Sequence, residues 1–132
     1  MSKSRGNVVD PMKYVMEYGA DVTRIAHMFM GDYCETKPWR EDVFKPCERL
    51  LNRIVALGEK VDKNISTQNK FILAQSIKKV SEDIEGLKFN TAVSQIMVLT
   101  NALEKMEKIS EEDFKVLLSL ACPFAPHTAE EL

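Results

Sequence analysis

Cysteine is scarce in this sequence of 132 residues, and no pattern gives the three cysteines a structural role. Cys34, Cys47 and Cys122 are widely spaced and odd in number, and neither a CxxC pair nor a histidine cluster accompanies them. Their spacing predicts neither a disulfide framework nor a zinc site. Reduced thiols are typical of cytoplasmic proteins, so we expect this chain to work in the cytoplasm.

Long apolar runs and a dominant charge are also lacking. No stretch approaches the roughly 20 apolar residues that span a bilayer, and the charged N-terminal segment lacks the apolar core of a signal peptide. We therefore expect no membrane partner. The net charge is −2, which excludes the global basic field of many stand-alone nucleic-acid-binding proteins. Any contact with RNA must be local.

The alternating pattern of strands is missing over any useful length, whereas helical spacing recurs. Apolar residues fall three or four positions apart over residues 40–63, 67–87 and 92–106. Such stripes predict helices that share a core, and short connections predict that neighbouring helices run antiparallel. We therefore expect an all-α fold, an up-and-down antiparallel helix bundle.

Helix-start signals place two more helices near the C-terminus. Ser110 and the acidic residues after it predict the start of a fourth bundle helix, which Pro123 ends. Pro126 can start a short helix after it. We expect the acidic residues of the bundle to lie on solvated faces or to favour the positive ends of helices, and the paired carboxylates to have no catalytic role. His27 is predicted to be a partly buried structural residue and His127 a capping or packing residue.

The first forty residues have shorter elements. Helical spacing over residues 12–18 ends at Gly19, a second helix is predicted over residues 20–30, and residues 31–38 have the composition of a linker. We place a domain boundary there, with a connector over residues 1–38 and the bundle over residues 39–132.

The N-terminal segment combines anion-binding chemistry with a helix start. Lys3 and Arg5 lie among two serines and a glycine, a composition that can wrap an anion with side-chain donors and a permissive backbone. Asp10 and Pro11 follow in the order that caps and begins a helix.

These eleven residues, MSKSRGNVVDP, resemble the KMSKS signature loop of class I aminoacyl-tRNA synthetases and the GNVVDP run that continues it. The YGAD run at residues 18–21 and Arg24 resemble the leucine, isoleucine and valine enzymes. The FNTA run at residues 89–92 and the PFAPHTAEEL run at residues 123–132 resemble leucyl-tRNA synthetases. The same region of an isoleucyl-, valyl- or methionyl-tRNA synthetase stays open as an alternative. The sequence departs from the pattern at Arg5, where lysine is usual, and over residues 32–45.

This resemblance implies the C-terminal part of a leucine–tRNA ligase, from the KMSKS loop through the anticodon-binding helical domain. In such an enzyme Lys3, supported by Ser2 and Ser4, would stabilise the phosphates of ATP, with Mg²⁺ as the second cofactor. The HIGH motif and the nucleotide-binding strands would lie in an upstream catalytic domain. We therefore expect the isolated chain to bind neither cofactor and to be inactive, and the chain ends to be cuts through a larger enzyme.

The partner that the resemblance implies is tRNA(Leu). Positive side chains recur along one helix face, where they could meet phosphates while the apolar face packs inward. This basic ridge comprises Lys45, Arg49, Asn52, Arg53 and Lys60. Glu41 and Glu48 are placed to pair with part of it, so a solvated ridge stays an alternative to an RNA-binding one. A free-standing tRNA-binding module and a purely structural bundle also stay open.

Overall fold

The computed structural model describes residues 3–6 and 8–132, and helices account for most of them. The helices are α1 (Pro11–Tyr18), α2 (Ala20–Phe29), α3 (Phe44–Gly58), α4 (Lys70–Glu85), α5 (Phe89–Glu104), α6 (Glu111–Ala121) and α7 (Pro126–Glu131). Two 3-10 turns, η1 (Lys3–Arg5) and η2 (Glu41–Val43), and two strands of two residues each, β1 (Val61–Asp62) and β2 (Ile109–Ser110), complete the described elements.

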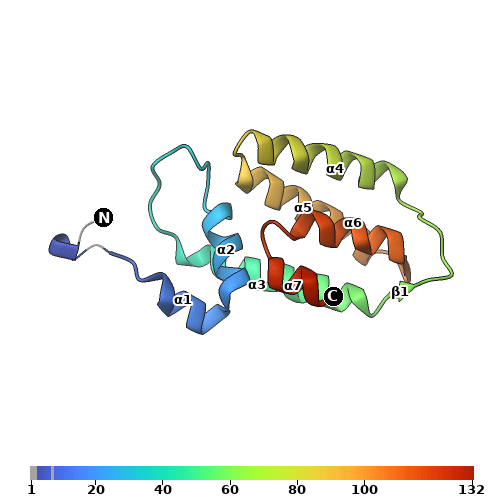
Figure 1. The fold of residues 1–132 in the computed structure, drawn as a ribbon, viewed down its shortest axis with the longest axis horizontal. Coiled ribbons are helices and arrows are strands. Elements are labelled where there is room, and N and C mark those ends of the chain that lie inside the picture. Colours follow the sequence, from blue (N-terminus) through green and yellow to red (C-terminus); the bar gives the residue numbers. More distant parts are fainter. Residues whose placement is uncertain (1–2, 7) are drawn as a thin grey trace.

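The helices from α3 to α7 reverse direction one after another, as Figure 1 shows. Within this bundle α4 and α5 form a helical hairpin, and α5 also packs on α3 and α6. The predicted all-α, up-and-down bundle is confirmed. None of the described helices combines the length and the apolar character that a membrane span requires.

The first bundle helix is shorter than predicted, because the residues at its two ends form a 3-10 turn and a strand pairing instead. Residues 41–43 form η2 before α3 begins at Phe44. At the other end the carbonyl of Lys60 accepts a hydrogen bond of 3.0 Å from the amide of Ile109. This contact begins the parallel pairing of β1 with β2 and ends the helical path. The connection to α4 is therefore long, which the sequence analysis did not predict.

The predicted helix caps are present. Asp10 accepts a hydrogen bond from the Met12 amide, and Pro11 is the first residue of α1. Gly19 separates α1 from α2 with a φ of 88°, a left-handed conformation that favours glycine. Ser110 accepts a hydrogen bond of 3.0 Å from the Asp113 amide at the start of α6.

One core joins the connector to the bundle. The apolar stripe of α3 is buried, and Tyr14, Val22, Ile25 and Ala26 from α1 and α2 belong to the same cluster of buried residues. The Tyr14 ring stacks on Phe44 with ring centroids 4.6 Å apart. The boundary between residues 1–38 and 39–132 stays a prediction, and α2 packs directly on α3 and α5.

Two acidic side chains of the bundle are buried, contrary to the solvated position that we expected for Asp83. Asp83 is 3% exposed and accepts a hydrogen bond of 2.6 Å from Lys79 one turn earlier. Asp113 lies in the first turn of α6, where the positive end of the helix favours a carboxylate. Cys47 is buried in the core, and this burial raises the pKa of its thiol to about 12. The cysteine is therefore a core residue and not a nucleophile.

Candidate functional site

The N-terminal loop reaches away from the bundle, as Figure 1 shows for its described residues. Lys3–Arg5 form the turn η1, and Gly6 follows with a φ of 65°. Ser4 and Arg5 are exposed. Ser2 and the side chain of Lys3 lie outside the described residues, so their predicted roles stay predictions.

The basic ridge on and just after α3 divides into two parts. Lys45, Arg49 and Asn52 are exposed, whereas Arg53 and Lys60 are half-buried against the end of α5. The first three are spaced four and three residues apart, which places them on one helix face. The amphipathic pattern of α3 explains this arrangement, since its opposite face fills the core.

Arg53 is tied to α5. Its Nε donates a hydrogen bond of 2.7 Å to one carboxylate oxygen of Glu104, and its terminal nitrogen donates to the other oxygen and to the side-chain oxygen of Asn101. The hydrogen bond from Arg53 lowers the pKa of the Glu104 carboxyl below its usual value. The same bond raises the pKa of Arg53. This bidentate pair joins α3 to α5.

Lys60 closes the C-terminal end of α5. Its Nζ donates hydrogen bonds of 2.9 Å to the backbone carbonyl of Glu104 and 3.0 Å to that of Met106. Carbonyls at a helix end have no partner within the helix, so a lysine that reaches them acts as a cap. The ammonium group of Lys60 is therefore used in the fold.

Lys45 and Arg49 are not used in this way. Within residues 3–6 and 8–132, no hydrogen bond or ion pair engages their side chains. The pairs expected with Glu41 and Glu48 do not form among these residues. Glu41 accepts a hydrogen bond from the Tyr14 hydroxyl instead, because the 3-10 turn η2 directs it toward α1.

A hollow of about 390 Å³ lies beside Asn52, between α2, α3 and α7. Its wall includes Tyr18, Gly19, His127 and Thr128. The hollow therefore brings one predicted ridge residue next to the YGAD segment and to the PFAPH segment. The cations Lys45 and Arg49 lie on the same helix as Asn52, before it in the chain.

The hollow also contains a contact that the sequence analysis missed. The buried carboxylate of Asp21 accepts hydrogen bonds from His127 Nδ1 at 2.8 Å and from the amide and hydroxyl of Thr128 at 2.7 Å each. His127 thus has the structural role that we predicted. No local pattern signals this contact, since its partners are more than 100 residues apart in the sequence.

His27 lies elsewhere and is exposed, contrary to the expected partial burial. Its Nδ1 lies 2.7 Å from the carbonyl oxygen of Thr23 in the preceding turn, and its ring meets Trp39 edge-on with centroids 5.0 Å apart. The ring lies against the indole but is not covered by it, which explains the exposure.

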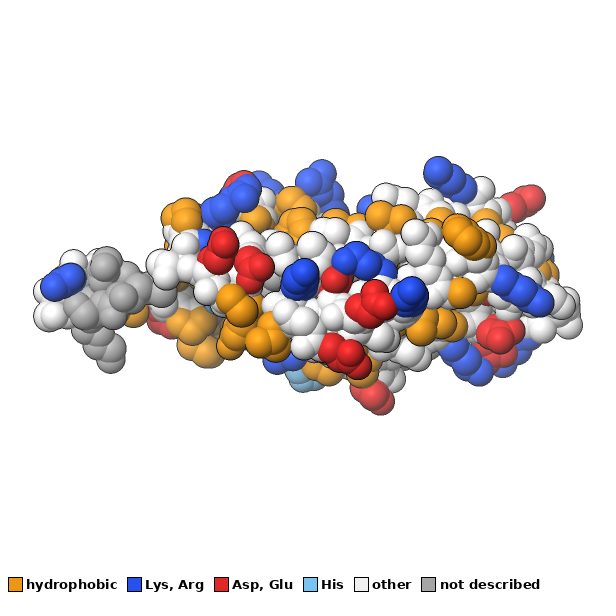
Figure 2. Space-filling model, turned by 90° about the horizontal axis from the view of Figure 1, so that it is seen from above, with side chains coloured by type: hydrophobic (Ala, Val, Ile, Leu, Met, Phe, Trp, Pro, Cys, Tyr) orange, Lys and Arg blue, Asp and Glu red, His pale blue; other side chains and the backbone are white. Residues whose placement is uncertain are grey.

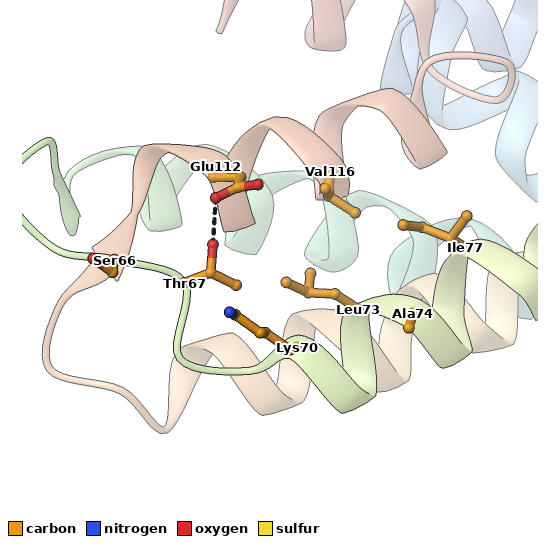
Figure 3. A pocket seen from close by; sticks show the side chains of 8 residues that line it. All are labelled: Ser66, Thr67, Lys70, Leu73, Ala74, Ile77, Glu112 and Val116. Carbon is orange, nitrogen blue, oxygen red and sulfur yellow. Dashed lines mark hydrogen bonds between the residues drawn. The ribbon is translucent and has the colours of Figure 1, made fainter.

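A second hollow, of about 380 Å³, lies between α4 and α6 (Figure 3). One end is polar, where the Thr67 hydroxyl donates a hydrogen bond of 2.6 Å to Glu112 and the Lys70 side chain points toward this pair. The rest is mainly apolar, with Leu73, Ala74, Ile77 and Val116. No predicted site residue lines it.

Charges of both signs are mixed on the face that Figure 2 shows. Lysine and arginine alternate there with aspartate and glutamate, in agreement with the net charge of −2. A polyanion would therefore find local groups of cations and not a broad positive field. The group formed by Lys45 and Arg49 fits this expectation.

The described part of the loop suits phosphate better than a metal ion. Ser4 and Arg5 offer a hydroxyl and a guanidinium, which are donors to phosphate oxygens. Asp10, the nearest carboxylate along the sequence, is engaged as the cap of α1. Among the described residues no group of three or more His, Cys, Asp or Glu side chains is arranged to hold a metal ion.

Comparisons with known proteins identify related chains. Residues 72–132 match the family model of the anticodon-binding domain of tRNA ligases. Over its full length the chain is 46% identical to the leucine–tRNA ligase of Alkaliphilus oremlandii, and 44% identical to that of Elusimicrobium minutum. It covers 17% and 16% of these two proteins, so it spans about a sixth of their length.

A solved structure has the same fold. It is the LeuRS in a crystal structure of a LeuRS–tRNA–LeuAMS ternary complex from Agrobacterium radiobacter K84. The similarity covers 99% of this chain and 20% of that one, with a TM-score of 0.84 and 29% sequence identity. The resemblance inferred from the sequence motifs is thereby confirmed, together with the helical fold.

Proposed function

We propose that this chain, which corresponds over its full length to one region of leucine–tRNA ligases, serves as a part of such an enzyme. It would provide the tRNA-binding helical bundle and the loop that precedes the bundle. The full-length similarity to leucine–tRNA ligases carries this proposal. The solved relative is described in complex with tRNA, which supports tRNA as the partner. The tRNA that fits the family is tRNA(Leu).

The first part of the basic ridge is the best candidate for the tRNA contact. Lys45 and Arg49 are exposed and have no partner among the described residues, so their full charge is available to phosphates. Asn52 lies on the same face and can donate a hydrogen bond from its amide. Contacts of this kind position a nucleic acid without reading its bases. The tRNA-binding roles predicted for Arg53 and Lys60 stay predictions. The nitrogen atoms of these two side chains already bond within the fold, so we expect them to contribute less.

The loop is proposed to serve the ATP-dependent step of the whole enzyme. Lys3, with Ser2 and Ser4, would hold the phosphates of ATP, and Mg²⁺ would neutralise part of the negative charge of these phosphates. Cleavage of ATP supplies the free energy for activating leucine. The chain's own contribution would be to place positive charge where negative charge develops in the reaction. The described strands have two residues each and form no nucleotide-binding sheet, so we expect no activation of leucine by these 132 residues alone.

We also propose that the protein works in the cytoplasm. The three cysteines are free, and Cys34 is exposed. Exposed thiols persist where the surroundings are reducing.

A tRNA-binding titration over a range of salt concentrations tests the proposal. Replacement of Lys45 and Arg49 by glutamate should weaken binding of tRNA(Leu) by roughly thirtyfold and reduce the slope of log K against log salt by about 2. The matched control replaces Lys70 and Lys78, two exposed cations of α4, by glutamate. Equal losses in both double variants, or no salt-sensitive binding by the natural chain, would contradict the proposal.

A further inference from the structure

Two side chains of α2 form hydrogen bonds with the turn between α6 and α7. Asp21 accepts three hydrogen bonds from His127 and Thr128, at the beginning of α7. One turn further along α2, Arg24 donates hydrogen bonds to the backbone carbonyls of Pro123 at 3.0 Å and Phe124 at 3.4 Å. We call these two residues of α2, Asp21 and Arg24, the α2 clamp.

The Asp21 carboxylate replaces the missing cap of α7. Ala125 precedes this helix and has no side-chain acceptor, so Asp21 supplies one from another part of the chain. Burial alone would raise the pKa of the Asp21 carboxyl, but the hydrogen bonds from His127 and Thr128 outweigh it, and the pKa lies below its usual value. The group is therefore a carboxylate at neutral pH and favours the positive end of α7.

Helix α7 depends on such external contacts. It has six residues, and isolated helices shorter than about 12 residues are marginal in water. Arg24 adds partners for the carbonyls that follow α6, which would otherwise lack them. The clamp thus fixes the last turn of the bundle to the connector.

The N-terminal end of α2 is joined to α1 through Gly19. Gly19, which separates α1 from α2, donates a backbone hydrogen bond to Val15 in α1 and accepts one from Thr23 in α2. Helix α1 begins at Pro11, directly after the loop. A short chain of hydrogen-bonded elements therefore leads from the α6–α7 turn through α2 and α1 to the loop.

We propose that Asp21 is a positioning residue, which makes α2 and the α6–α7 turn one unit, so that tRNA bound to the bundle limits the motion of α1. This inference rests on the proposed tRNA-binding function. Asp21 acts through the helices that it joins and needs no contact with tRNA or ATP.

Hydrogen exchange of backbone amides, resolved by segment, tests the inference on the 132-residue chain. In the natural chain, saturating tRNA(Leu) should slow exchange in α1 by about fivefold or more. Asp21→Asn keeps the size of the side chain but removes its negative charge and replaces one acceptor oxygen by a donor that faces His127 or Thr128. It should reduce the slowing in α1 by about half or more, with the direct packing of Tyr14 on Phe44 accounting for the rest, while the tRNA dissociation constant changes by less than about twofold.

Asp62→Asn is the matched control. Asp62 also accepts three hydrogen bonds, from the Asn64 amide, the Asn64 side chain and Lys108, at the opposite end of the bundle. This variant should retain the effect of tRNA on α1. Should Asp21→Asn fail to fold, Arg24→Ala removes the other half of the clamp at an exposed position and should also reduce the slowing.

Two results would overturn the inference. The first is slowing of α1 by tRNA that is undiminished in the folded clamp variants, and the second is tRNA that binds the natural chain without any effect on α1. Absence of tRNA binding would instead refute the proposed function and the positioning role with it. The clamp itself is then judged on the free chain, where Asp21→Asn should accelerate exchange in α2 and α7 more than in α4 and α5.

Discussion

Lys45 and Arg49 lie in the first half of α3 and have no hydrogen-bond or ion-pair partner among the described residues, whereas Arg53 and Lys60, in and just after its second half, each bond to two groups at the end of α5. The side chains are of the same type and recur with helical spacing. The difference comes from the neighbouring helix, because α5 presents Glu104 and its C-terminal carbonyls to the second half. Cations held in this way stabilise the fold, while unpaired cations remain available to a polyanion.

The largest expected effect is a difference in the free energy of unfolding between variants in the two halves of α3. Replacement of Arg53 by glutamine and Lys60 by methionine removes the links from α3 to α5 and leaves carbonyls without partners, which should lower the free energy of unfolding by about 2 kcal/mol. Lys45→Gln with Arg49→Gln should change it by less than about 0.5 kcal/mol. Urea unfolding followed by circular dichroism measures both. Similar values for the two double variants would remove the distinction.

The second prediction concerns tRNA binding by the first half alone. Arg49→Ala should weaken tRNA binding about fivefold, roughly 1 kcal/mol, and reduce the salt slope by about 1, because one phosphate contact is lost. Arg53→Ala should weaken binding by less than about twofold once its lower stability is taken into account. Filter binding at two salt concentrations distinguishes them. A larger loss for Arg53→Ala would assign the tRNA contact to the second half.

The sequence predicted much of the fold because its signals are local. Apolar spacing, the cap at Asp10, the turn at Gly19 and the cap at Ser110 each act within a few residues, and the structure contains them all. The division of the basic ridge was not predictable in the same way. It depends on Glu104, which is 51 residues from Arg53 in the sequence, and on the register that the pairing of β1 with β2 imposes on Lys60.

No sequence pattern predicts the α2 clamp, for the same reason. The YGAD run contains Asp21 and the PFAPH run contains His127, predicted to cap or pack, but neither run signals that the two side chains meet. Their contact requires that α2 pack against the end of the bundle, which only the common core brings about. Burial of Asp83 and Asp113 likewise reflects tertiary packing that overrides the polar character of these residues.

The third prediction uses pH to weaken the ion pair between Arg53 of α3 and Glu104 of α5. The hydrogen bond from Arg53 lowers the pKa of Glu104 in the folded state, so the stabilisation is present above the ordinary glutamate pKa and is lost as the pH falls through the lowered value. Both side chains are about one-third exposed, so solvent screening limits the effect to roughly 0.5 kcal/mol.

Unfolding of the natural chain and of Glu104→Gln over a range of pH measures this effect. The natural chain should be the more stable near neutral pH, and the difference should disappear under acidic conditions. Glu85→Gln, at an exposed position in α4, controls for the general effect of removing one carboxylate. A difference that grows as the pH falls would contradict the assignment.

The smallest expected effect comes from freeing Arg53, in the second half of α3, so that it resembles the unpaired cations of the first half. Glu104→Gln removes the negative charge that neutralises Arg53 but leaves the guanidinium on the same helix as Lys45 and Arg49. If pairing is what separates the halves, the variant should bind tRNA about twofold more tightly, with a salt slope increased by up to about 1. The variant Glu104→Gln with Arg53→Gln should lose this gain, because the released charge is then absent. An equal gain in both variants would show that the removed carboxylate repels tRNA directly, and that pairing with Glu104 does not decide which cations of the ridge are available.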